Sequence, residues 1–312
     1  MPRTFTSLHR INGDTSSLTA VKRYGFVYLN RLNNAFSDYW IDSALRRSFF
    51  ISPQLEVFWS DIGQTVSPSR ALCDLFWREL PWPAIQDELE GIYIFDIGCG
   101  SGHYGLILSK ASGGRIAHYV GMDVVEHPGW ADLSLEYPKF FCCRKSGSDR
   151  RLGPFPQNTN LIISQSAFEH ISDDLRYFRD LRDFILRERR CGLQVHMLPA
   201  AACLQLYPYH GIRQYTPRTV SMISRLFREF SVVRLFALGG QACNALHWKW
   251  ITRPQEYEHR DLRYEWPEEY NRLLQAAIRE DFATHGSEPA FYALTIQSFP
   301  HKDLLSGWCG AT

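Results

Sequence analysis

The chain has 312 residues, of which 45% are hydrophobic and 14% are aromatic, so it can form one large domain or two smaller ones with a packed core. Its 34 basic and 33 acidic residues nearly cancel, which excludes a global electrostatic field that would draw the chain to nucleic acid or to an anionic membrane. The eight cysteines form no Cys-x-x-Cys pair, and neither a signal peptide nor a membrane span is evident, so we expect a cytoplasmic protein with reduced thiols.

The first 90 residues contain apolar and aromatic positions at helical spacing and no series of strands. Helices are predicted over residues 18–32, 37–49 and 67–80. Ser67 is a typical N-cap before Pro68, and residues 81–83, with the sequence Pro-Trp-Pro, are expected to break the third helix. This helical N-terminal extension either covers an edge of the sheet that follows or forms a lid over a substrate pocket, and the sequence does not favour one over the other.

The best-defined feature is the segment 92–105, with the sequence IYIFDIGCGSGHYG. Its apolar start predicts a short buried strand that ends at Asp96, and a helix is expected to continue through Leu106. A glycine-rich turn between a strand and a helix lets the backbone approach a ligand closely, so an anion or a nucleotide can bind there. The alternative is a tight turn that binds no ligand.

Two glycine patterns overlap in this loop. Gly100, Gly102 and Gly105 satisfy the dinucleotide pattern G-x-G-x-x-G. Asp96 and the glycines that follow it resemble the D-x-G-x-G-x-G signature of class I S-adenosylmethionine (SAM) methyltransferases. The carboxylate of Asp96 favours the second pattern, because it would face the cationic amino acid end of SAM and would repel a pyrophosphate.

A second acid strengthens the prediction of a ligand site. Residues 116–122 are predicted to form the next strand, which ends at Asp123, 21 residues after Gly102. Nucleotide-binding α/β folds place a carboxylate at this distance to hold the ribose hydroxyls. The glycine loop and Asp123 together are much more specific than either alone, so a turn without a ligand becomes the weaker interpretation.

From residue 91 onward, predicted strands alternate with helices, which is typical of a parallel sheet with crossover helices. The strands are expected at residues 92–95, 116–122, 139–144, 161–164, 193–198, 231–238 and 290–298. The sequence Phe-Glu-His at 168–170 and the capped helix after it resemble the strand-four segment of class I SAM methyltransferases, whose seven strands also match this count. The resemblance implies a Rossmann-like α/β fold: a seven-stranded, mostly parallel sheet flanked by helices, with the last strand antiparallel.

The resemblance also implies a division of the chain and a function. The helical extension would cover residues 1–90, and the SAM-binding methyltransferase domain would cover 91–300, with an insertion near 241–285 and a tail at 301–312. We expect a SAM-dependent methyltransferase that acts on a small-molecule or glycan acceptor, at a hydroxyl oxygen. The Asn/Asp-Pro-Pro-aromatic motif of amino methyltransferases is absent after the fourth strand, and the net charge argues against long nucleic acids as substrates.

SAM-binding residues follow from the same resemblance. Asp96, the loop and Asp123 would contact the cofactor, and the end of the fourth strand would border the site of methyl transfer. The cofactor-binding residues predicted in this way are Asp96, Gly98, Cys99, Gly100, Ser101, Gly102, Asp123, Asp149, Ser164 and Gln165. Asp149 resembles the acid that contacts the adenine amino group in many of these enzymes, and an exposed loop acid is its other interpretation.

Transfer of a methyl group to a hydroxyl requires a base that removes the hydroxyl proton, and imidazole titrates in the suitable range. His210 and His170 are the candidate catalytic residues; each can instead be a histidine that only supports its own segment. The loop after the fifth strand offers Tyr209, Arg213 and Tyr215 for substrate binding, since tyrosines pack against sugar faces and arginine donates hydrogen bonds. The histidines lack convincing ligand spacing, so no metal site is expected.

Two alternative functions stay open. The dinucleotide pattern is compatible with an NAD-dependent oxidoreductase, although this function leaves Asp96 and the segment 168–170 without a role. A methyltransferase-like scaffold without catalysis could bind a partner through its aromatic N-terminal helices. The sequence does not indicate the oligomeric state or the identity of the acceptor.

Overall fold

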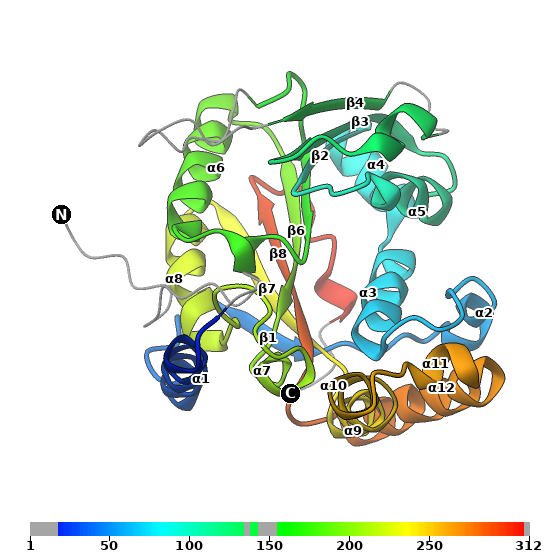
Figure 1. The fold of residues 1–312 in the computed structure, drawn as a ribbon. Coiled ribbons are helices and arrows are strands. Elements are labelled where there is room, and N and C mark those ends of the chain that lie inside the picture. The colour runs from blue at the N-terminus through cyan, green and yellow to red at the C-terminus, as the bar shows by residue number, and fades with distance from the viewer. Residues whose placement is uncertain (1–17, 134–137, 143–154, 309–312) are drawn as a thin grey trace.

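The computed structural model describes residues 18–133, 138–142 and 155–308. Within these residues an eight-stranded sheet forms the centre of the molecule, with the strand order β1-β7-β8-β6-β5-β2-β3-β4 (Figure 1). The strands are β1 (Arg46–Phe49), β2 (Ile92–Ile97), β3 (Ile116–Asp123), β4 (Pro138–Cys142), β5 (Leu161–Gln165), β6 (Gly192–Pro199), β7 (Ser231–Leu238) and β8 (Phe291–Ser298). Neighbouring strands are parallel except for β8, which runs antiparallel to β6 and β7.

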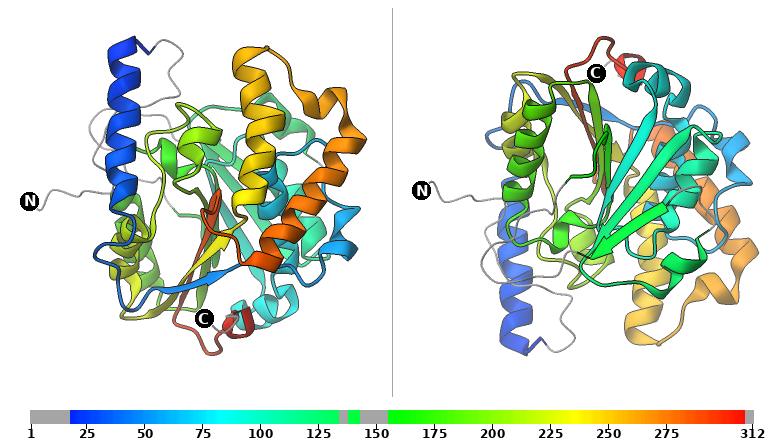
Figure 2. Two further views of the ribbon diagram at one scale, coloured as in Figure 1. Left: turned by 90° about the horizontal axis from the view of Figure 1, so that it is seen from below. Right: turned by 90° about the horizontal axis from the view of Figure 1, so that it is seen from above.

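Helices cover both faces of the sheet (Figures 1 and 2). The α-helices are α1 (Ala20–Ala35), α2 (Leu55–Trp59), α3 (Pro68–Glu79), α4 (Trp82–Leu89), α5 (His103–Ala111), α6 (Asp174–Glu188), α7 (Cys203–Leu206), α8 (Pro217–Phe227), α9 (Gln241–His247), α10 (Arg253–Tyr257), α11 (Leu262–Glu265) and α12 (Pro267–Thr284). The short 3₁₀-helices are η1 (Pro128–Asp132), η2 (Phe168–His170) and η4 (Ser306–Trp308), and η3 (Trp248–Thr252) is a π-helix. The predicted fold, a mostly parallel sheet flanked by helices with an antiparallel last strand, is confirmed. The described sheet has eight strands instead of the expected seven, because β1 pairs with β7 and adds an edge strand.

Two hydrophobic clusters hold the helices on the sheet. One contains Phe178 of α6 and Phe227 of α8, and the other contains Phe76 and Trp77 of α3. All four side chains are completely buried. Burial of this much aromatic surface is the main favourable contribution to the stability of such a layered fold.

The strand order reverses between β2 and β5. From β2 the chain moves outward through β3 to β4, and then it returns to the other side of β2 and continues through β5 to β6. This puts the carboxyl ends of β2 and β5 side by side, and open α/β sheets bind ligands at such a switch point. The glycine loop follows β2 and η2 follows β5, so the fold brings the two predicted motifs together.

The prediction of a helix over residues 37–49 is wrong. Its last part forms β1, which pairs in parallel with β7 and places Arg46 opposite Arg234. Trp40, which contributed to the helical spacing, has a left-handed backbone with a φ of 56° and an exposed side chain. The outer edge of β7 offers backbone hydrogen bonds to β1, and this long-range pairing overrides the local helical pattern.

The other two predicted N-terminal helices are confirmed as α1 and α3. Ser67 caps α3, because its hydroxyl accepts a hydrogen bond from the Arg70 N–H at 3.3 Å. The break at residues 81–83 ends α3 and also begins α4, which is missing from the sequence prediction, since proline is tolerated in the first turn of a helix. β1 covers an edge of the sheet, and α3 packs on its face.

Residues 241–285 are mostly helical, from α9 through η3, α10 and α11 to α12 (Figure 2). Tyr270, Leu274 and Ile278 of α12 belong to the same hydrophobic cluster as Phe76 of α3.

The division of the chain into an extension, one domain with an insertion, and a tail remains a prediction. Among the described helices, none combines the length and the apolar composition needed to cross a bilayer.

Candidate active site

The glycine loop between β2 and α5 has a backbone conformation that requires glycine. Gly98, Gly100 and Gly102 have φ values of 71°, 53° and 77°, in the left-handed region that other residues rarely adopt. A Cβ atom on Gly98 would lie 2.5 Å from the Cβ of Ala167, and one on Gly102 would lie 2.6 Å from the Cδ1 of Leu133. A Cβ on Gly100 would meet no atom of the described residues within 4 Å, so the backbone there borders open space that a ligand can approach.

Asp123, at the end of β3, contacts this loop directly. Its Oδ2 accepts a hydrogen bond from the Gly100 N–H at 2.8 Å, and its Oδ1 accepts one from the Val124 N–H at 2.6 Å. The indole N–H of Trp130 donates to the Gly100 carbonyl at 2.8 Å, and the ring stacks on Phe140 with centroids 4.9 Å apart. The carboxylate and the indole therefore flank Gly100. The position of Asp123 follows from the sequence pattern, whereas no pattern indicates Trp130.

Asp96, the last but one residue of β2, is only 1% exposed. Its Oδ2 accepts a hydrogen bond from the Tyr119 hydroxyl at 2.5 Å, whereas its Oδ1 has no hydrogen-bond partner among the described residues. Burial raises the pKa of the Asp96 carboxyl to about 7, the Tyr119 hydrogen bond opposes this rise, and the charge of Asp123 adds to it. A cationic ligand beside Oδ1 would compensate the carboxylate charge and lower this pKa again.

These residues fit the cofactor that the sequence resemblance implies. The open side of the loop leaves room for a ligand, Asp123 offers carboxylate oxygens to hydroxyl groups, and the unpartnered Oδ1 of Asp96 suits the positive charge of SAM. Cys99, which is nearly buried, and Ser101 complete the loop. The other predicted contact, Asp149, lies outside the described residues.

A cavity of about 240 Å³, here named the inner cavity, opens at the carboxyl end of β5. It is lined by Ser67, Ser69, Arg70, Cys73, Gln165, Ser166, Tyr207, His210 and Phe291. One wall comes from α3 and its N-cap, so the N-terminal extension forms part of this site. The Trp77 indole N–H donates to Oε1 of Gln165 at 3.2 Å, and the Ser69 hydroxyl lies 3.1 Å from the Tyr207 hydroxyl. These hydrogen bonds hold the two walls together.

A hydrogen-bonded network connects the inner cavity to the helix that follows the glycine loop. The Tyr104 hydroxyl of α5 donates to Oδ1 of Asp74 at 3.0 Å, and Arg70 donates from Nη1 to the same hydroxyl oxygen at 2.6 Å. Burial raises the pKa of Asp74 to about 6, and the charge of Arg70 opposes the rise. No sequence pattern indicates this network, because α3 and α5 meet only in the fold.

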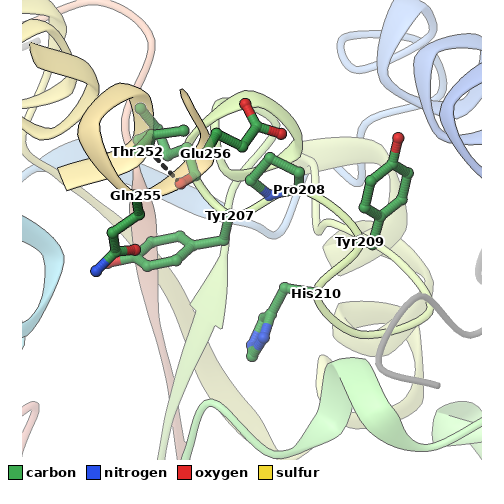
Figure 3. A pocket seen from close by; sticks show the side chains of 8 residues that line it. Tyr207, Pro208, Tyr209, His210, Thr252, Gln255 and Glu256 are labelled. Atoms are coloured by element: carbon green, nitrogen blue, oxygen red, sulfur yellow. Dashed lines mark hydrogen bonds between the residues drawn. The ribbon is translucent and has the colours of Figure 1, made fainter. Parts of the chain in front are cut away.

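A wider cavity of about 420 Å³, the outer cavity, lies next to the inner one and shares lining residues with it. Figure 3 shows the side chains that line the outer cavity. It is lined by Leu206, Tyr207, Pro208, Tyr209, His210, Thr252, Gln255 and Glu256. Tyr207 and His210 line both cavities. The Thr252 hydroxyl donates to the Leu206 carbonyl at 2.6 Å, which fixes η3 against the loop that carries these residues. In Figure 3 the ring of Tyr209 points away from Tyr207, toward α1.

The two predicted catalytic histidines lie together beside Glu169. The Nε2 atoms of His210 and His170 are 3.4 Å and 3.9 Å from Oε1 of Glu169, and the two rings are nearly perpendicular with centroids 4.8 Å apart. The Glu169 side chain is fully buried, and the Ser166 hydroxyl donates to its Oε1. Such a group of imidazoles and a carboxylate can move a proton or bind a cation. Glu169 is not among the predicted site residues, because in the sequence it only marks the strand-four segment.

Arg213 and Tyr215 lie in a different environment from the predicted substrate site. Both side chains are almost completely buried, and neither lines the inner or the outer cavity. Arg213 donates from Nη1 to the Ile171 carbonyl at 2.6 Å and forms an ion pair of 3.2 Å with Asp174, which also accepts from the Tyr215 hydroxyl at 2.7 Å. The two residues therefore anchor the 207–215 loop on the start of α6.

The remaining predicted residues are divided between the core and the cavities. Ser164 is fully buried, with its hydroxyl 2.9 Å from Nδ1 of His196, and burial lowers the pKa of that histidine to about 3. His196 is thus a neutral core residue. Gln165 lines the inner cavity, and Tyr209 lines the outer one, where its ring centroid lies 5.7 Å from that of Phe26 in α1.

No protein-family model and no curated protein matches the chain. Similar solved structures include the plantazolicin methyltransferase BamL in complex with a triazolic desmethylPZN analog and SAH, at 13% identity over 79% of this chain and 90% of that chain, with a TM-score of 0.44. The [4+2]-cyclase SpnF shares 13% identity over 70% and 79% of the two chains (TM-score 0.40). A SAM-dependent methyltransferase from Mesorhizobium loti shares 14% sequence identity, and the match covers 69% of this chain and 96% of that chain, with a TM-score of 0.37. Likenesses this distant leave the activity to be inferred from the residues of the site.

Proposed function

We propose that the protein is a SAM-dependent methyltransferase that acts on a hydroxyl oxygen of a small-molecule or glycan acceptor. The observation that carries this proposal is the buried carboxyl of Asp96, with an unpartnered Oδ1, at the base of an open glycine loop. When bound, SAM supplies a methyl group on a positively charged sulfur. The residues of the chain bind the cofactor, orient the acceptor and remove its proton.

The charge of the site favours SAM over a dinucleotide. An ionised Asp96 would repel the pyrophosphate of NAD, whereas the cationic groups of SAM would compensate its charge. Asp123 is proposed to accept hydrogen bonds from the ribose hydroxyls. Its carboxylate is already oriented by the hydrogen bonds from Gly100 and Val124, so its oxygens are in place to accept hydrogen bonds before the cofactor binds.

The two cavities suit a polar acceptor of moderate size. The outer cavity has a volume typical of small-molecule sites, and its tyrosine rings can pack against a sugar or an aromatic ring. The inner cavity continues to Gln165 at the end of β5, close to the glycine loop that follows the neighbouring strand β2. An acceptor that enters through the outer cavity would present its hydroxyl group to the inner one, past His210.

We assign the removal of the acceptor proton to the cluster of Glu169, His170 and His210. An imidazole accepts a hydroxyl proton efficiently near neutral pH, and a buried carboxylate orients the ring and stabilises the charge that it acquires. His210 lines both cavities, so it is the member of the cluster that an acceptor can reach. The imidazole of His210 would accept the acceptor proton, and SAM would supply the methyl group and leave as S-adenosylhomocysteine when its sulfur–methyl bond breaks.

Calorimetric titration with SAM, S-adenosylhomocysteine and NAD tests the cofactor assignment. We expect affinities on the order of micromolar for the first two, as is usual for such sites, and no binding of NAD. Asp96→Asn should weaken SAM binding, and the matched exposed variant Asp87→Asn should not. Transfer of labelled methyl groups from SAM into a cell extract then identifies the acceptor. Binding of NAD in place of SAM contradicts the proposal, and SAM binding without transfer to any acceptor pool favours a scaffold function.

A further inference from the structure

Glu169, His170 and His210 have the geometry of a metal site. One carboxylate oxygen of Glu169 and one ring nitrogen of each histidine all lie within 4.8 Å of one another, and Nε2 of His210 is 3.4 Å from Oε1 of Glu169. Two ligands of a tetrahedral ion with bond lengths of about 2.1 Å are roughly 3.4 Å apart. Small changes of side-chain torsion would therefore bring all three atoms to bonding distance of one ion.

The carboxylate of Glu169 also lacks part of the compensation that a buried charge needs. The side chain is completely buried, and its Oε2 has no hydrogen-bond partner among the described residues. Its Oε1 accepts from the Ser166 hydroxyl, which is a neutral donor. Burial of an ionised carboxylate costs several kcal/mol unless a positive charge accompanies it. A bound cation would supply that charge and a partner for the free oxygen.

The backbone holds the three residues in place before any ion binds. Glu169 and His170 belong to η2, and the Ile212 N–H donates to the Glu169 carbonyl at 2.7 Å. Gly211 makes this approach possible, because a Cβ on it would lie 2.9 Å from Cγ of Glu169. His210 therefore sits on a loop segment that is tied directly to η2. Preorganised ligands lower the cost of binding a metal.

We propose that Glu169, His170 and His210 bind a divalent first-row transition-metal ion, with its remaining coordination positions open to the inner cavity. Two imidazoles and one carboxylate suit Zn²⁺, Mn²⁺ or Fe²⁺ better than Mg²⁺ or Ca²⁺, which prefer oxygen ligands alone. Three protein ligands leave room for water or substrate, as in catalytic rather than structural sites. The sequence does not suggest this site, because His210 lies far from the other two ligands along the chain.

The ion would deepen the proposed function, and this part of the inference rests on that function. A hydroxyl group that binds a divalent ion loses its proton more readily, so the acceptor would release its proton to solvent water at neutral pH. With the ion bound, the metal replaces the imidazole of His210 as the group that activates the acceptor hydroxyl, and the histidines act as ligands that hold the ion against the inner cavity. Metal binding itself requires neither SAM nor an acceptor, so it can be tested separately.

A second group of ligand-type residues, Glu88, Cys191 and His301, is a weaker candidate. Oε1 of Glu88 already accepts backbone hydrogen bonds from His301 and Lys302, at 2.6 Å and 3.1 Å. Burial raises the pKa of Cys191 to about 12, so a metal would have to displace a firmly held proton to bind this thiol. This group provides the matched control, because His301→Ala removes an exposed histidine from it.

The test uses the full chain, stripped of metal with a chelator and then titrated with Zn²⁺ and, separately, with Mn²⁺, in the absence of SAM. We expect one ion per chain for the wild type and for His301→Ala. Glu169→Gln and His210→Asn should weaken binding by at least about 10-fold, which is the loss caused by even an indirect metal partner. Circular dichroism checks that each variant is folded; the partly exposed His210 keeps the test decisive if Glu169→Gln does not fold.

Three outcomes overturn the proposal: no binding of either ion by the wild type, equal affinity in the wild type and in His210→Asn, or loss of binding in His301→Ala. Loss of binding in His301→Ala would assign the ion to the other group instead. A SAM titration of the same samples separates the two hypotheses. If SAM binds and metal does not, the metal site is wrong and the cofactor assignment is retained. If metal binds and SAM does not, the cofactor assignment is wrong and the metal site is retained.

Discussion

The burial of Asp96 disfavours the charged form of its carboxyl group. Its carboxyl is buried, one oxygen lacks a partner among the described residues, and burial raises its pKa to about 7. A side chain retained at such a cost in stability usually serves a ligand rather than the fold. The sequence motif predicts the residue but not its burial, which depends on Tyr119 of the neighbouring strand β3.

Replacement of Asp96 by asparagine should stabilise the ligand-free protein at alkaline pH. The folded-state pKa of about 7 lies above the ordinary value of 3.8, so the folded protein keeps this proton longer than the unfolded chain, and stability is lost as pH rises between these values. Asparagine has no proton to lose. Urea unfolding should show a gain of at least about 1 kcal/mol at about pH 8 and a clearly smaller one at about pH 4. The same gain at both pH values would contradict this assignment.

Substitution of Gly98 tests whether the glycine loop requires glycine for its backbone conformation. Its φ of 71° disfavours any side chain, and a Cβ would also lie 2.5 Å from the Cβ of Ala167. Gly114 is the matched control: its φ is 75°, and a Cβ there would meet no described atom within 4 Å. We expect Gly114→Ala to cost about 1 kcal/mol and Gly98→Ala to cost more, because the clash adds to the strain. Chemical denaturation measures both, and equal costs would show that the contact with Ala167 is relieved freely.

At the scale of elements, the order of strands and helices after residue 91 could be predicted, because each element carries its own local pattern. The edge strand β1 could not be predicted. Its residues are mostly polar, and it exists because β7, much later in the chain, offers it an open edge. The residues of the site differ in the same way. The glycine loop is one short segment, so the sequence predicts it. The contact between His170 and His210 depends on Gly211 and on the path of the 207–215 loop, so local sequence patterns do not predict it.

The ion pair between Arg213 and Asp174 should be important for that loop. Arg213→Met would remove the guanidinium that lies 3.2 Å from the buried carboxylate of Asp174, at a cost of about 3–5 kcal/mol. Arg218→Met, which removes a partly exposed arginine over the ring of Trp40, should cost less than about 1 kcal/mol. Urea denaturation compares the two variants. If they are equally stable, the pair does not anchor the loop.

At the scale of the whole molecule, the helices of residues 241–285 are not a separate module. The Tyr270 hydroxyl donates to the Val66 carbonyl at 2.7 Å, and the ring belongs to the same hydrophobic cluster as Phe76 and Ile94. The segment therefore shares its core with the sheet and with α3. We propose that it shapes the outer cavity, to which η3 and α10 contribute Thr252 and Glu256.

A shared core predicts cooperative unfolding. The described part of the chain should unfold in a single transition in urea, because loss of α12 would expose the cluster beneath it. The far-ultraviolet circular dichroism, which reports helices, and tryptophan fluorescence, to which the buried Trp77 and Trp250 contribute, should give coincident curves. Two separated transitions would show that residues 241–285 form an independent unit.

The place of β8 in the sheet affects how the protein is completed during synthesis. β8 lies between β6 and β7, and within the described sheet it connects the pair β1–β7 to the other strands. Among the described strands it is also the last in sequence, so a ribosome makes the other described strands before residues 291–298 emerge. Until then the nascent chain contains two incomplete sheets whose exposed edges can pair with other chains. The final strand joins the two pieces and removes both of these aggregation-prone edges at once.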